Sequence, residues 1–345
     1  MIKVGVVGAT GYTGIELLRL LSMHEAAELV VATSNSEIGK TVQDVFPSLR
    51  GFVDLEFQAH DSEQLKSCDF VFFATPHATA MNHVPQLLDQ DCKVIDLSAD
   101  FRITNPAVWE QWYQVKHACP DLLTKAVYGL PELNRQKIKS ANLVANPGCY
   151  PTAITLALLP AVEKGLINMG DIIADAKSGV SGAGRKAALA TQFSEASESF
   201  KAYSASGHRH LPEIMQSLNS VQTESEVNMT FVPHLVPMNR GIFATVYVKA
   251  TENAEDLQEH YSAYYSGEKF VDVMPQGSHP DTASVRTTNS CRISIHPGKD
   301  QSQHTVILSV IDNLVKGAAG QAIQNMNIML GLDETMGLAT PGLTP

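Results

Sequence analysis

The sequence predicts an α/β protein, with a Rossmann-like, doubly wound parallel sheet followed by an α+β domain that has a mostly antiparallel sheet. The first observation is that short apolar runs alternate with helical stretches over residues 1–148, as is typical of βαβ units in a sheet covered on both faces. The second is a change after residue 152 to longer β-like runs, one of which partly alternates apolar and polar residues. The third is the length of 345 residues, which fits two domains of roughly 100–200 residues each.

The first part contains the short apolar runs expected to form buried strands, at residues 3–7, 29–33, 70–74, 94–97 and 141–145. An amphipathic stretch at 14–22 predicts the first helix. In the second part, Pro151 and Thr152 indicate the start of a helix over 153–165, and Gly165 its end. Strands are expected at 171–176, 227–232, 241–249 and 304–312, and a helix rich in small residues at 317–330.

Composition excludes several classes of protein. With 36 acidic and 25 basic residues the net charge is -11, so the surface repels nucleic acid and anionic lipid, and neither is expected as a partner. No stretch approaches the ~18 consecutive apolar residues of a membrane span. The opening residues enter a strand directly instead of forming a secretion signal. We therefore expect a cytoplasmic protein that binds small molecules.

A glycine-rich segment, GATGYTG, lies at residues 8–14 between the first predicted strand and the first predicted helix. At such a turn, backbone N–H groups and the helix N-terminus hold a pyrophosphate, and glycine lets the ligand approach closely. The position makes a dinucleotide site the preferred interpretation over a tight turn without a ligand. The residues expected to bind the cofactor here are Gly8, Thr10, Gly11, Tyr12, Thr13 and Gly14.

The end of the second predicted strand indicates which dinucleotide is bound. NAD sites place an acidic residue there to bind the ribose hydroxyls, whereas this strand ends in ATSNS without a carboxylate. Hydroxyl and amide donors suit a 2′-phosphate and avoid the repulsion of a carboxylate. The sequence therefore favours NADP, with Ser34 and Ser36 near the 2′-phosphate.

The segment NPGCYPT places Cys149 at a Pro/Gly turn just ahead of a predicted helix. A helix N-terminus stabilises a thiolate, which is the nucleophilic form of cysteine. Inert buried cysteine is the usual fate of the residue type and is expected for Cys68, Cys92, Cys119 and Cys291. The five cysteines are odd in number and contain no CxxC pair, so neither a disulfide framework nor a zinc site is expected. Cys149 is the predicted nucleophile.

An acid/base should accompany the thiol, and GHRHLPEI offers His208, His210 and Glu213 in one short segment. Pro212 is tolerated in the first turn of a helix, so we expect a helix to open near Leu211 and Glu213 to orient His210 as the principal acid/base. The reverse assignment, with His208 facing the thiol, stays open. The three side chains could instead bind a metal, but no companion cluster exists elsewhere in the sequence, so no metal is expected.

A second glycine-rich segment, SGVSGAGRK, spans residues 178–186. It nearly spells a phosphate-binding P-loop, but Arg185 and Lys186 break that motif, so an ATPase is rejected. The segment can still pass close to a nicotinamide or an acyl phosphate. Arg102 and Arg240 lie at strand boundaries and are candidate anion-binding groups.

Together, GATGYTG, DLSADFR, NPGCYPT, SGVSGAGRK, GHRHLPEI, PMNRG and KGAAGQAIQNMN resemble the series of motifs found along the type 1 family of N-acetyl-gamma-glutamyl-phosphate reductases of arginine biosynthesis. The matches run in the same order from residue 5 to about residue 330. NPGCYPT and GHRHLPEI are the specific ones. Aspartate-semialdehyde dehydrogenases share the architecture and a Cys/His pair, but their cysteine context differs.

The resemblance implies an NADP-dependent reductase of an acyl phosphate that works through a Cys149 thioester, assembled as a homodimer or homotetramer. It implies a dinucleotide-binding domain of residues 1–148 and 313–345, completed by the C-terminal helix, and a catalytic and oligomerisation domain of residues 149–312. The cofactor is expected to contact Ser178, Gly179 and Gly182 as well as GATGYTG. The substrate and its phosphate are expected to contact Arg102, Asn146, Ser181, Lys186 and Arg240.

Three other functions fit the sequence less well. A reductase of a carrier-bound aminoadipyl phosphate of lysine biosynthesis would need to dock an acidic carrier, which a net charge of -11 disfavours. A catalytically idle NADP-binding sensor needs no activated nucleophile. A cysteine hydrolase does not need the dinucleotide motif.

Overall fold

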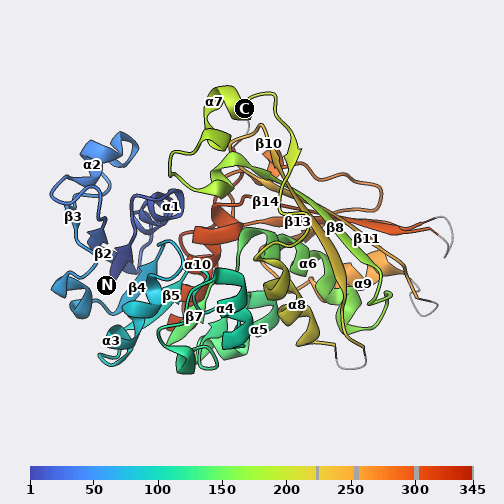
Figure 1. Ribbon diagram of the computed structural model, residues 1–345, viewed down its shortest axis with the longest axis horizontal. Coiled ribbons are helices and arrows are strands. Elements are labelled where there is room, and N and C mark those ends of the chain that lie inside the picture. The colour runs from blue at the N-terminus through green and yellow to red at the C-terminus, as the bar shows by residue number, and fades with distance from the viewer. Residues whose placement is uncertain (223–224, 252–255, 299–302, 344–345) are drawn as a thin grey trace. The chain divides into compact units, whose positions relative to one another are not determined.

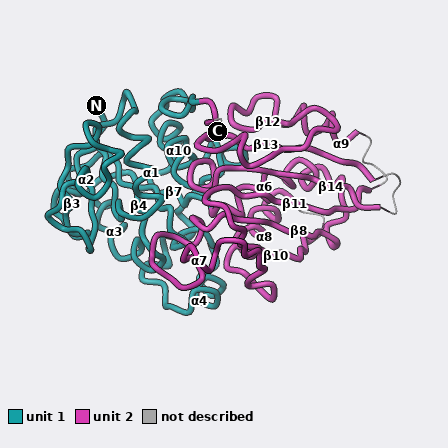
Figure 2. Tube along the Cα trace, turned by 90° about the horizontal axis from the view of Figure 1, so that it is seen from above, with its two compact units in different colours: residues 1–147, 318–340 teal, residues 148–317, 341–345 magenta. Residues whose placement is uncertain are grey.

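The computed structural model describes residues 1–222, 225–251, 256–298 and 303–343, which divide into two compact units (Figures 1 and 2). Unit 1 consists of Met1–Pro147 and Ala318–Thr340, and unit 2 of Gly148–Gly317 and Pro341–Pro345. The chain therefore leaves unit 1 immediately before Cys149 and returns to it immediately before the C-terminal helix.

Unit 1 is built on a seven-stranded sheet with the order β3-β2-β1-β4-β5-β7-β6, in which every pairing is parallel. The strands are β1 (Ile2–Val7), β2 (Ala27–Thr33), β3 (Phe57–Gln58), β4 (Phe70–Phe73), β5 (Lys93–Asp96), β6 (Val127–Tyr128) and β7 (Leu143–Ala145). The predicted parallel sheet is confirmed, with a strand at each of the predicted positions. The strands β3 and β6 were not predicted, because two residues are too few to give an apolar run.

Helices cover both faces of this sheet, as two-sided burial of the strands requires (Figure 1). They are α1 (Tyr12–Leu21), α2 (Val42–Val45), α3 (Val84–Leu88), α4 (Pro106–Tyr113), α5 (Pro131–Lys139) and α10 (Gly320–Leu330). One core cluster joins alternate strand residues, such as Val7, Val71 and Phe73, to Trp109 and Tyr113 of α4. On the other face α10 packs beside α1 and α5.

Unit 2 is built on a second seven-stranded sheet with the order β12-β13-β14-β11-β8-β10-β9. The strands are β8 (Ile172–Gly179), β9 (Lys201–Ala202), β10 (Met229–Val236), β11 (Ile242–Val248), β12 (Val271–Val273), β13 (Cys291–His296) and β14 (Thr305–Ile311). Only the β8–β10 and β12–β13 pairs are parallel, so the predicted mostly antiparallel sheet is confirmed. The strands β9, β12 and β13 were not predicted, although Cys291, Ile293 and Ile295 alternate along β13.

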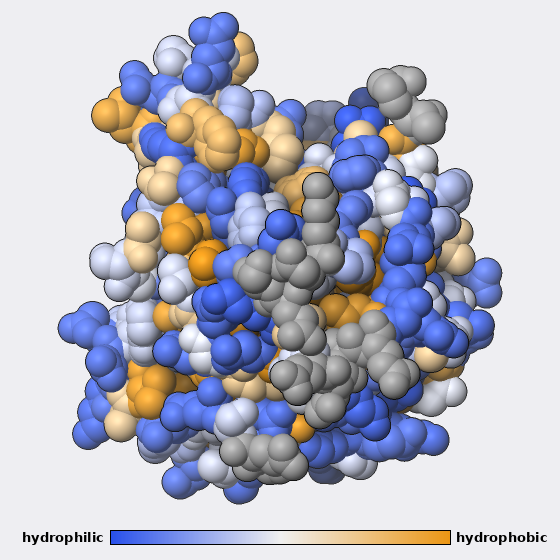
Figure 3. All heavy atoms as spheres, turned by 90° about the vertical axis from the view of Figure 1, so that its right-hand side faces the viewer, coloured by the Kyte–Doolittle hydropathy of each residue, from blue (hydrophilic) through white to orange (hydrophobic). Residues whose placement is uncertain are grey.

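Helix α6 (Cys149–Glu163) lies against β11 and β14 and is flanked by α8 (Leu211–Asn219) and α9 (Leu257–Tyr264). Two tyrosines anchor it, because the hydroxyls of Tyr261 and Tyr265 each donate a 2.7 Å hydrogen bond to a backbone carbonyl of α6. Burial alternates along β11, so Phe243, Thr245 and Tyr247 are half-exposed on the other face of the sheet. The short helix α7 (Phe193–Ala196) lies in the segment before β9. The face in Figure 3 is mostly hydrophilic, with scattered hydrophobic residues.

Two predicted helix boundaries were wrong. Helix α6 begins at Cys149, four residues before the predicted start at 153, because Gly148 is its N-cap and Pro151 is accommodated in the first turn. The C-terminal helix starts at Gly320 and is preceded by a π-helical turn, Val315–Ala319, rather than beginning at 317. Within the described ranges, no helix has both the length and the apolar character needed to cross a membrane.

Candidate active site

The GATGYTG segment of unit 1 forms the turn between β1 and α1. Strand β1 lies between β2 and β4, so this turn is at the point where the strand order reverses, the usual place for a ligand in such sheets. Gly8 has a φ of +82°, and an added Cβ would lie 2.6 Å from the Ala74 carbonyl oxygen. An added Cβ on Gly14 would lie 2.4 Å from the Gly8 oxygen. Positions 8 and 14 therefore admit only glycine, and the tight turn places its backbone and the α1 N-terminus where a dinucleotide phosphate binds in such sheets.

Hydroxyl groups gather where β2 ends. Thr10 Oγ1 lies 2.9 Å from Ser34 Oγ, which lies 3.3 Å from Ser36 Oγ. The nearby carboxylate of Glu37 is paired with Lys40 at 2.8 Å. The structure thus brings together the serines predicted for the 2′-phosphate and the threonine of the glycine-rich turn.

In unit 2, Cys149 is the first residue of α6, where the N–H groups of the first turn and the positive end of the helix dipole favour a thiolate. The carboxylate of Glu213, which is 1% exposed, accepts a 2.8 Å hydrogen bond from the Gly148 backbone N–H. The absence of a side chain on Gly317 is needed here, because an added Cβ would lie 2.9 Å from the Cβ of Cys149. The bond to Glu213 therefore fixes the turn that carries the thiol, and glycine at position 317 lets the backbone pack closely against it.

The remaining cysteines have different surroundings. Burial raises the pKa of Cys68 to about 11 and that of Cys92 to about 12. Burial and the nearby Asp100 carboxylate raise the pKa of Cys119 to about 11. Cys291 is buried and lies 3.4 Å from the Ser309 hydroxyl. Three of these thiols are therefore held in the protonated, unreactive form at neutral pH.

The histidine segment lies beside the nucleophile's helix. His210 is the N-cap of α8, with Pro212 in its first turn, so the predicted helix start at Leu211 is confirmed. The His208 and His210 rings are 4.8 Å apart, and the Tyr150 ring lies 5.8 Å and 6.0 Å from them. His208 Nδ1 accepts a 3.1 Å hydrogen bond from the His210 backbone N–H, so that nitrogen carries no proton.

The surroundings of His208 control its charge. Burial, assisted by the neighbouring Arg209 cation, lowers the pKa of His208 to about 4. His208 is therefore neutral at physiological pH and cannot gain a proton easily. A neutral His208 is unsuited to exchange a proton near neutrality, which leaves His210, at the N-cap of α8, as the candidate acid/base.

Two tyrosines that the sequence analysis missed complete the surroundings of the thiol. The Tyr203 hydroxyl donates a 3.2 Å hydrogen bond to the Tyr150 hydroxyl, which in turn donates to the His234 carbonyl oxygen at 3.1 Å. Burial, and to a smaller extent the charge of Cys149, raises the pKa of Tyr203 to about 12. Burial raises the pKa of Tyr150 as well. Tyr150 follows the cysteine directly in NPGCYPT, which is the signal that could have identified it.

The loop 178–184 lies against the loop that carries Arg240. Val180 N donates to Met238 O at 2.9 Å, and Ser181 N to Asn239 O at 3.1 Å. An added Cβ on Gly179 would lie 2.8 Å from the Asn239 carbonyl oxygen, so glycine is required for this approach. Of the residues predicted on these loops, Ser178 is buried, Ser181 and Arg240 are half-buried, and Gly182 and Lys186 are exposed.

Arg102 and Asn146 of unit 1 have bonded partners that the sequence did not predict. Arg102 is 8% exposed, and it donates to the backbone carbonyls of Asn146 at 2.8 Å and Leu97 at 2.7 Å. The Asn146 amide donates to Ala318 O at 3.1 Å and accepts from Asn325 at 3.1 Å. These contacts give both residues a bracing role in the turn that ends unit 1.

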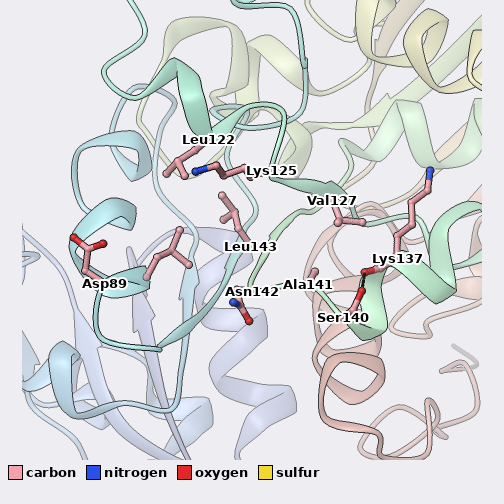
Figure 4. A pocket seen from close by; sticks show the side chains of 10 residues that line it. Asp89, Leu122, Lys125, Val127, Lys137, Ser140, Ala141, Asn142 and Leu143 are labelled. Atoms are coloured by element: carbon pink, nitrogen blue, oxygen red, sulfur yellow. Dashed lines mark hydrogen bonds between the residues drawn. The ribbon is translucent and has the colours of Figure 1, made fainter.

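Unit 1 also contains a cavity of about 570 Å³, shown in Figure 4. Leu88, Leu122, Val127 and Leu143 form its apolar lining, and Asp89, Lys125, Lys137, Ser140 and Asn142 contribute exposed polar groups. None of the residues predicted for the site lines this cavity. In the described part of the chain, no group of three His, Cys, Asp or Glu side chains could hold a metal ion.

Comparison with known proteins follows the division of the chain. Residues 3–141 match the family model described as semialdehyde dehydrogenase, NAD binding domain. Residues 149–313 match the one described as semialdehyde dehydrogenase, dimerisation domain. An N-acetyl-gamma-glutamyl-phosphate reductase of Saccharophagus degradans is 55% identical, and one of Nitrosococcus oceani 57% identical, each over 100% of both chains.

Solved structures with a similar fold have much lower identity. Aspartate semialdehyde dehydrogenase II of Vibrio cholerae is 17% identical with a TM-score of 0.75, covering 96% of this chain and 99% of that one. Aspartate semialdehyde dehydrogenase with NADP from Candida albicans is 16% identical with a TM-score of 0.71, covering 96% and 98%. At this identity the likeness shows the shared fold only.

Proposed function

The chain belongs to the N-acetyl-gamma-glutamyl-phosphate reductase family of the semialdehyde dehydrogenases, and on this basis we propose that it reduces N-acetyl-gamma-glutamyl phosphate to N-acetyl-glutamate 5-semialdehyde in arginine biosynthesis. The reaction consumes NADPH and releases phosphate. The observation that carries the proposal is the placement of Cys149 as the first residue of α6 in a chain with full-length similarity to such reductases. The 16% and 17% identity to aspartate semialdehyde dehydrogenases does not favour aspartyl phosphate as substrate.

The nucleotide fits the residues of unit 1. A turn that excludes side chains at Gly8 and Gly14 can hold the pyrophosphate, and the hydroxyls of Thr10, Ser34 and Ser36 can hold the 2′-phosphate. When bound, NADPH supplies the hydride that reduces the acyl group. The loop 178–184 of unit 2, with Ser178, Gly179 and Gly182, is proposed to contact the same cofactor.

The thiolate of Cys149 attacks the acyl carbon, and the bond to the phosphate oxygen breaks, so that a thioester forms and phosphate leaves. Stabilisation by the α6 N-terminus keeps the sulfur ionised for this step. His210 takes up the thiol proton and returns a proton to the oxyanion that forms when the thioester is reduced. It accepts that proton again as the C–S bond breaks, which releases the aldehyde and frees the Cys149 sulfur. The His208 ring lies beside Tyr150, the residue after the thiol, and Tyr203 bonds to the Tyr150 hydroxyl, so these side chains are proposed to limit access of water, which would hydrolyse the thioester.

Glu213 is proposed to orient this site. Its buried carboxylate is fixed by the Gly148 N–H, so α8, which carries it, is tied to the start of α6. Because His210 is the N-cap of the same helix, this bond also sets the position of the acid/base relative to the thiol. Arg240, Ser181 and Lys186 are proposed to bind the phosphate or the substrate carboxylate.

The match to a dimerisation domain indicates that the chain assembles with copies of itself, and we propose a homodimer or a dimer of dimers. The half-exposed face of the unit 2 sheet, with Phe243, Thr245 and Tyr247 on β11, is the proposed contact. Sedimentation of wild type and Tyr247→Lys tests this, because a charge at a dry interface should shift the protein toward monomer. An unchanged mass would place the interface elsewhere.

The activity test is NADPH oxidation by the purified protein with a panel of acyl phosphates: N-acetyl-gamma-glutamyl, aspartyl and aminoadipyl. The reverse assay supplies N-acetyl-glutamate 5-semialdehyde, phosphate and NADP. We expect kcat/KM to be highest for N-acetyl-gamma-glutamyl phosphate by several orders of magnitude. A higher value for another acyl phosphate would overturn the proposed substrate.

A further inference from the structure

We infer that Asp312 is a positioning residue of the active site: it holds the guanidinium of Arg240 and the turn that packs Gly317 against Cys149 in one rigid arrangement. The inference rests on the proposed function, since it concerns how the acyl phosphate is bound beside the thiol. Asp312 follows β14 directly, and all the contacts that support its role lie within unit 2.

The Asp312 carboxylate is fully buried and gathers donors from three segments of the chain. Its Oδ2 accepts from Arg240 Nη1 at 3.1 Å and from Thr287 N at 2.7 Å. Its Oδ1 accepts from Leu314 N at 2.8 Å and from Val315 N at 3.3 Å. A buried charge is stable only when paired and hydrogen-bonded, so the ion pair with Arg240 and these amides depend on one another.

The backbone of Asp312 connects this ion pair to the nucleophile. Its carbonyl oxygen accepts a 2.9 Å hydrogen bond from Gly317 N, which closes the π-helical turn Val315–Ala319. Gly317 is the residue whose added Cβ would lie 2.9 Å from the Cβ of Cys149. A displacement of Asp312 would therefore move both Arg240 and the wall of the thiol site.

Asn313, the next residue, bonds to the loop that carries Arg240 and to the neighbouring loop 178–184. Its amide oxygen accepts from Gly241 N at 2.7 Å, and its amide nitrogen donates to Ser181 Oγ at 2.9 Å. Asp312 thus binds the Arg240 side chain, and Asn313 binds the backbone amide of the next residue, Gly241. An arginine held in this way has lost its rotamer freedom before an anion arrives, which lowers the entropic cost of binding.

Thr287 provides independent evidence that the position of Asp312 is under constraint. It is a β-branched residue with a φ of +65°, in the left-handed region that such residues rarely adopt. Strain of this kind persists where surrounding contacts determine the backbone, and it is concentrated at functional sites. In this conformation the Thr287 N–H donates the 2.7 Å hydrogen bond to Asp312.

The substitution Asp312→Asn tests the positioning role of the carboxylate without changing the volume of the side chain. It keeps the size of the side chain but offers one acceptor oxygen, and it points an N–H₂ donor at groups that are themselves donors. We expect the KM for the acyl phosphate to rise roughly tenfold or more, while kcat changes by less than about threefold and NADPH affinity is unchanged. Asp171→Asn, which removes an exposed ion pair with Lys249 at the start of β8, is the matched control and should behave as wild type.

A double-mutant cycle with Arg240→Ala tests whether Asp312 acts through the arginine. If it does, Asp312→Asn has little further effect on KM in the Arg240→Ala background, and millimolar guanidinium ion restores substrate affinity to Arg240→Ala but not to the double variant. Independent, multiplying effects on KM, or an unchanged KM in folded Asp312→Asn, would overturn the inference and leave Asp312 a purely structural residue. Thermal unfolding of each variant identifies a fold defect.

Binding of inorganic phosphate, measured by calorimetry on the same variants, keeps the two proposals separate. If wild type reduces none of the acyl phosphates, the proposed function fails, whereas phosphate binding still reports on the anion site. We expect Asp312→Asn to weaken phosphate binding by roughly tenfold or more relative to wild type and Asp171→Asn. Equal phosphate affinity in all three proteins contradicts the role given to Asp312.

Discussion

Replacing His208 and His210 one at a time by asparagine identifies the acid/base, because the buried His208 imidazole is neutral at physiological pH. Burial, with Arg209 adding to it, lowers the pKa of His208 to about 4. At pH 7 the pH lies about three units above this pKa, so only about one His208 imidazole in a thousand is protonated. His208 therefore cannot produce an ionisation of the activity near neutrality.

The assay is the pH dependence of kcat/KM between roughly pH 5 and 9, followed by NADPH oxidation. His210→Asn should lower the rate by roughly 10²–10⁴-fold, the usual contribution of general acid–base catalysis, and should remove one ionisation from the acidic limb. His208→Asn should keep the wild-type limb and lose rate only through altered packing. If His210→Asn keeps that limb and His208→Asn loses it, the assignment is reversed.

The lowered pKa of His208 also predicts how stability depends on pH. The folded-state pKa of about 4 lies below the ordinary value of 6.5, so the unfolded chain binds the proton more readily as the pH falls. The stability due to neutral His208 is full above pH 6.5 and is lost progressively toward pH 4. Because the side chain is partly exposed, this pKa difference corresponds to only about 1–2 kcal/mol. Urea unfolding should show a flatter pH dependence in His208→Asn, and an identical dependence would refute the lowered pKa.

Further predictions concern the nucleophile and the nucleotide. Cys149→Ser should abolish reduction and leave NADPH binding nearly intact, because a hydroxyl is not ionised at neutral pH; a residual rate above a few per cent with purified protein removes Cys149 from the nucleophile role. NADPH should bind at least about tenfold more tightly than NADH by fluorescence titration, and Ser36→Asp should reduce that ratio by repelling the 2′-phosphate, so equal wild-type affinities contradict the assignment. Gly14→Ala should weaken NADPH binding by at least roughly tenfold, because its Cβ would lie 2.4 Å from a backbone oxygen, whereas Gly267→Ala, with nothing within 4 Å, should bind as wild type.

The sequence predicted those features that depend on local pattern. Apolar runs with glycine-rich turns located the parallel strands of unit 1, because burial on both faces makes each strand a continuous apolar segment. The sequence also predicted that His210 lies just before α8, since Pro212 fits the first helical turn. Hydroxyls at the end of β2 were also found from sequence, because the end of a strand fixes where Ser34 and Ser36 lie.

Features set by long-range contacts could not be predicted. No local sequence pattern identifies Asp312 as a buried carboxylate that accepts several hydrogen bonds, because its partners at 240 and 287 are distant in the sequence. The bracing of Asn146 by Arg102 is of the same kind, as both were interpreted only as substrate contacts. The start of α6 was missed because Pro151 was taken as a boundary signal, although proline is tolerated inside the first turn.

The central claim is that reduction passes through a thioester on Cys149, and single-turnover chemistry without a reductant tests it most directly. The protein is mixed with N-acetyl-gamma-glutamyl phosphate in the presence of NADP but no NADPH, and both released phosphate and the mass of the protein are followed. The account predicts one phosphate released per chain and an acyl adduct on the peptide that contains Cys149, removed when NADPH is added. Cys149→Ser should give neither signal. Phosphate release without an adduct, or an adduct on another cysteine, would contradict the account.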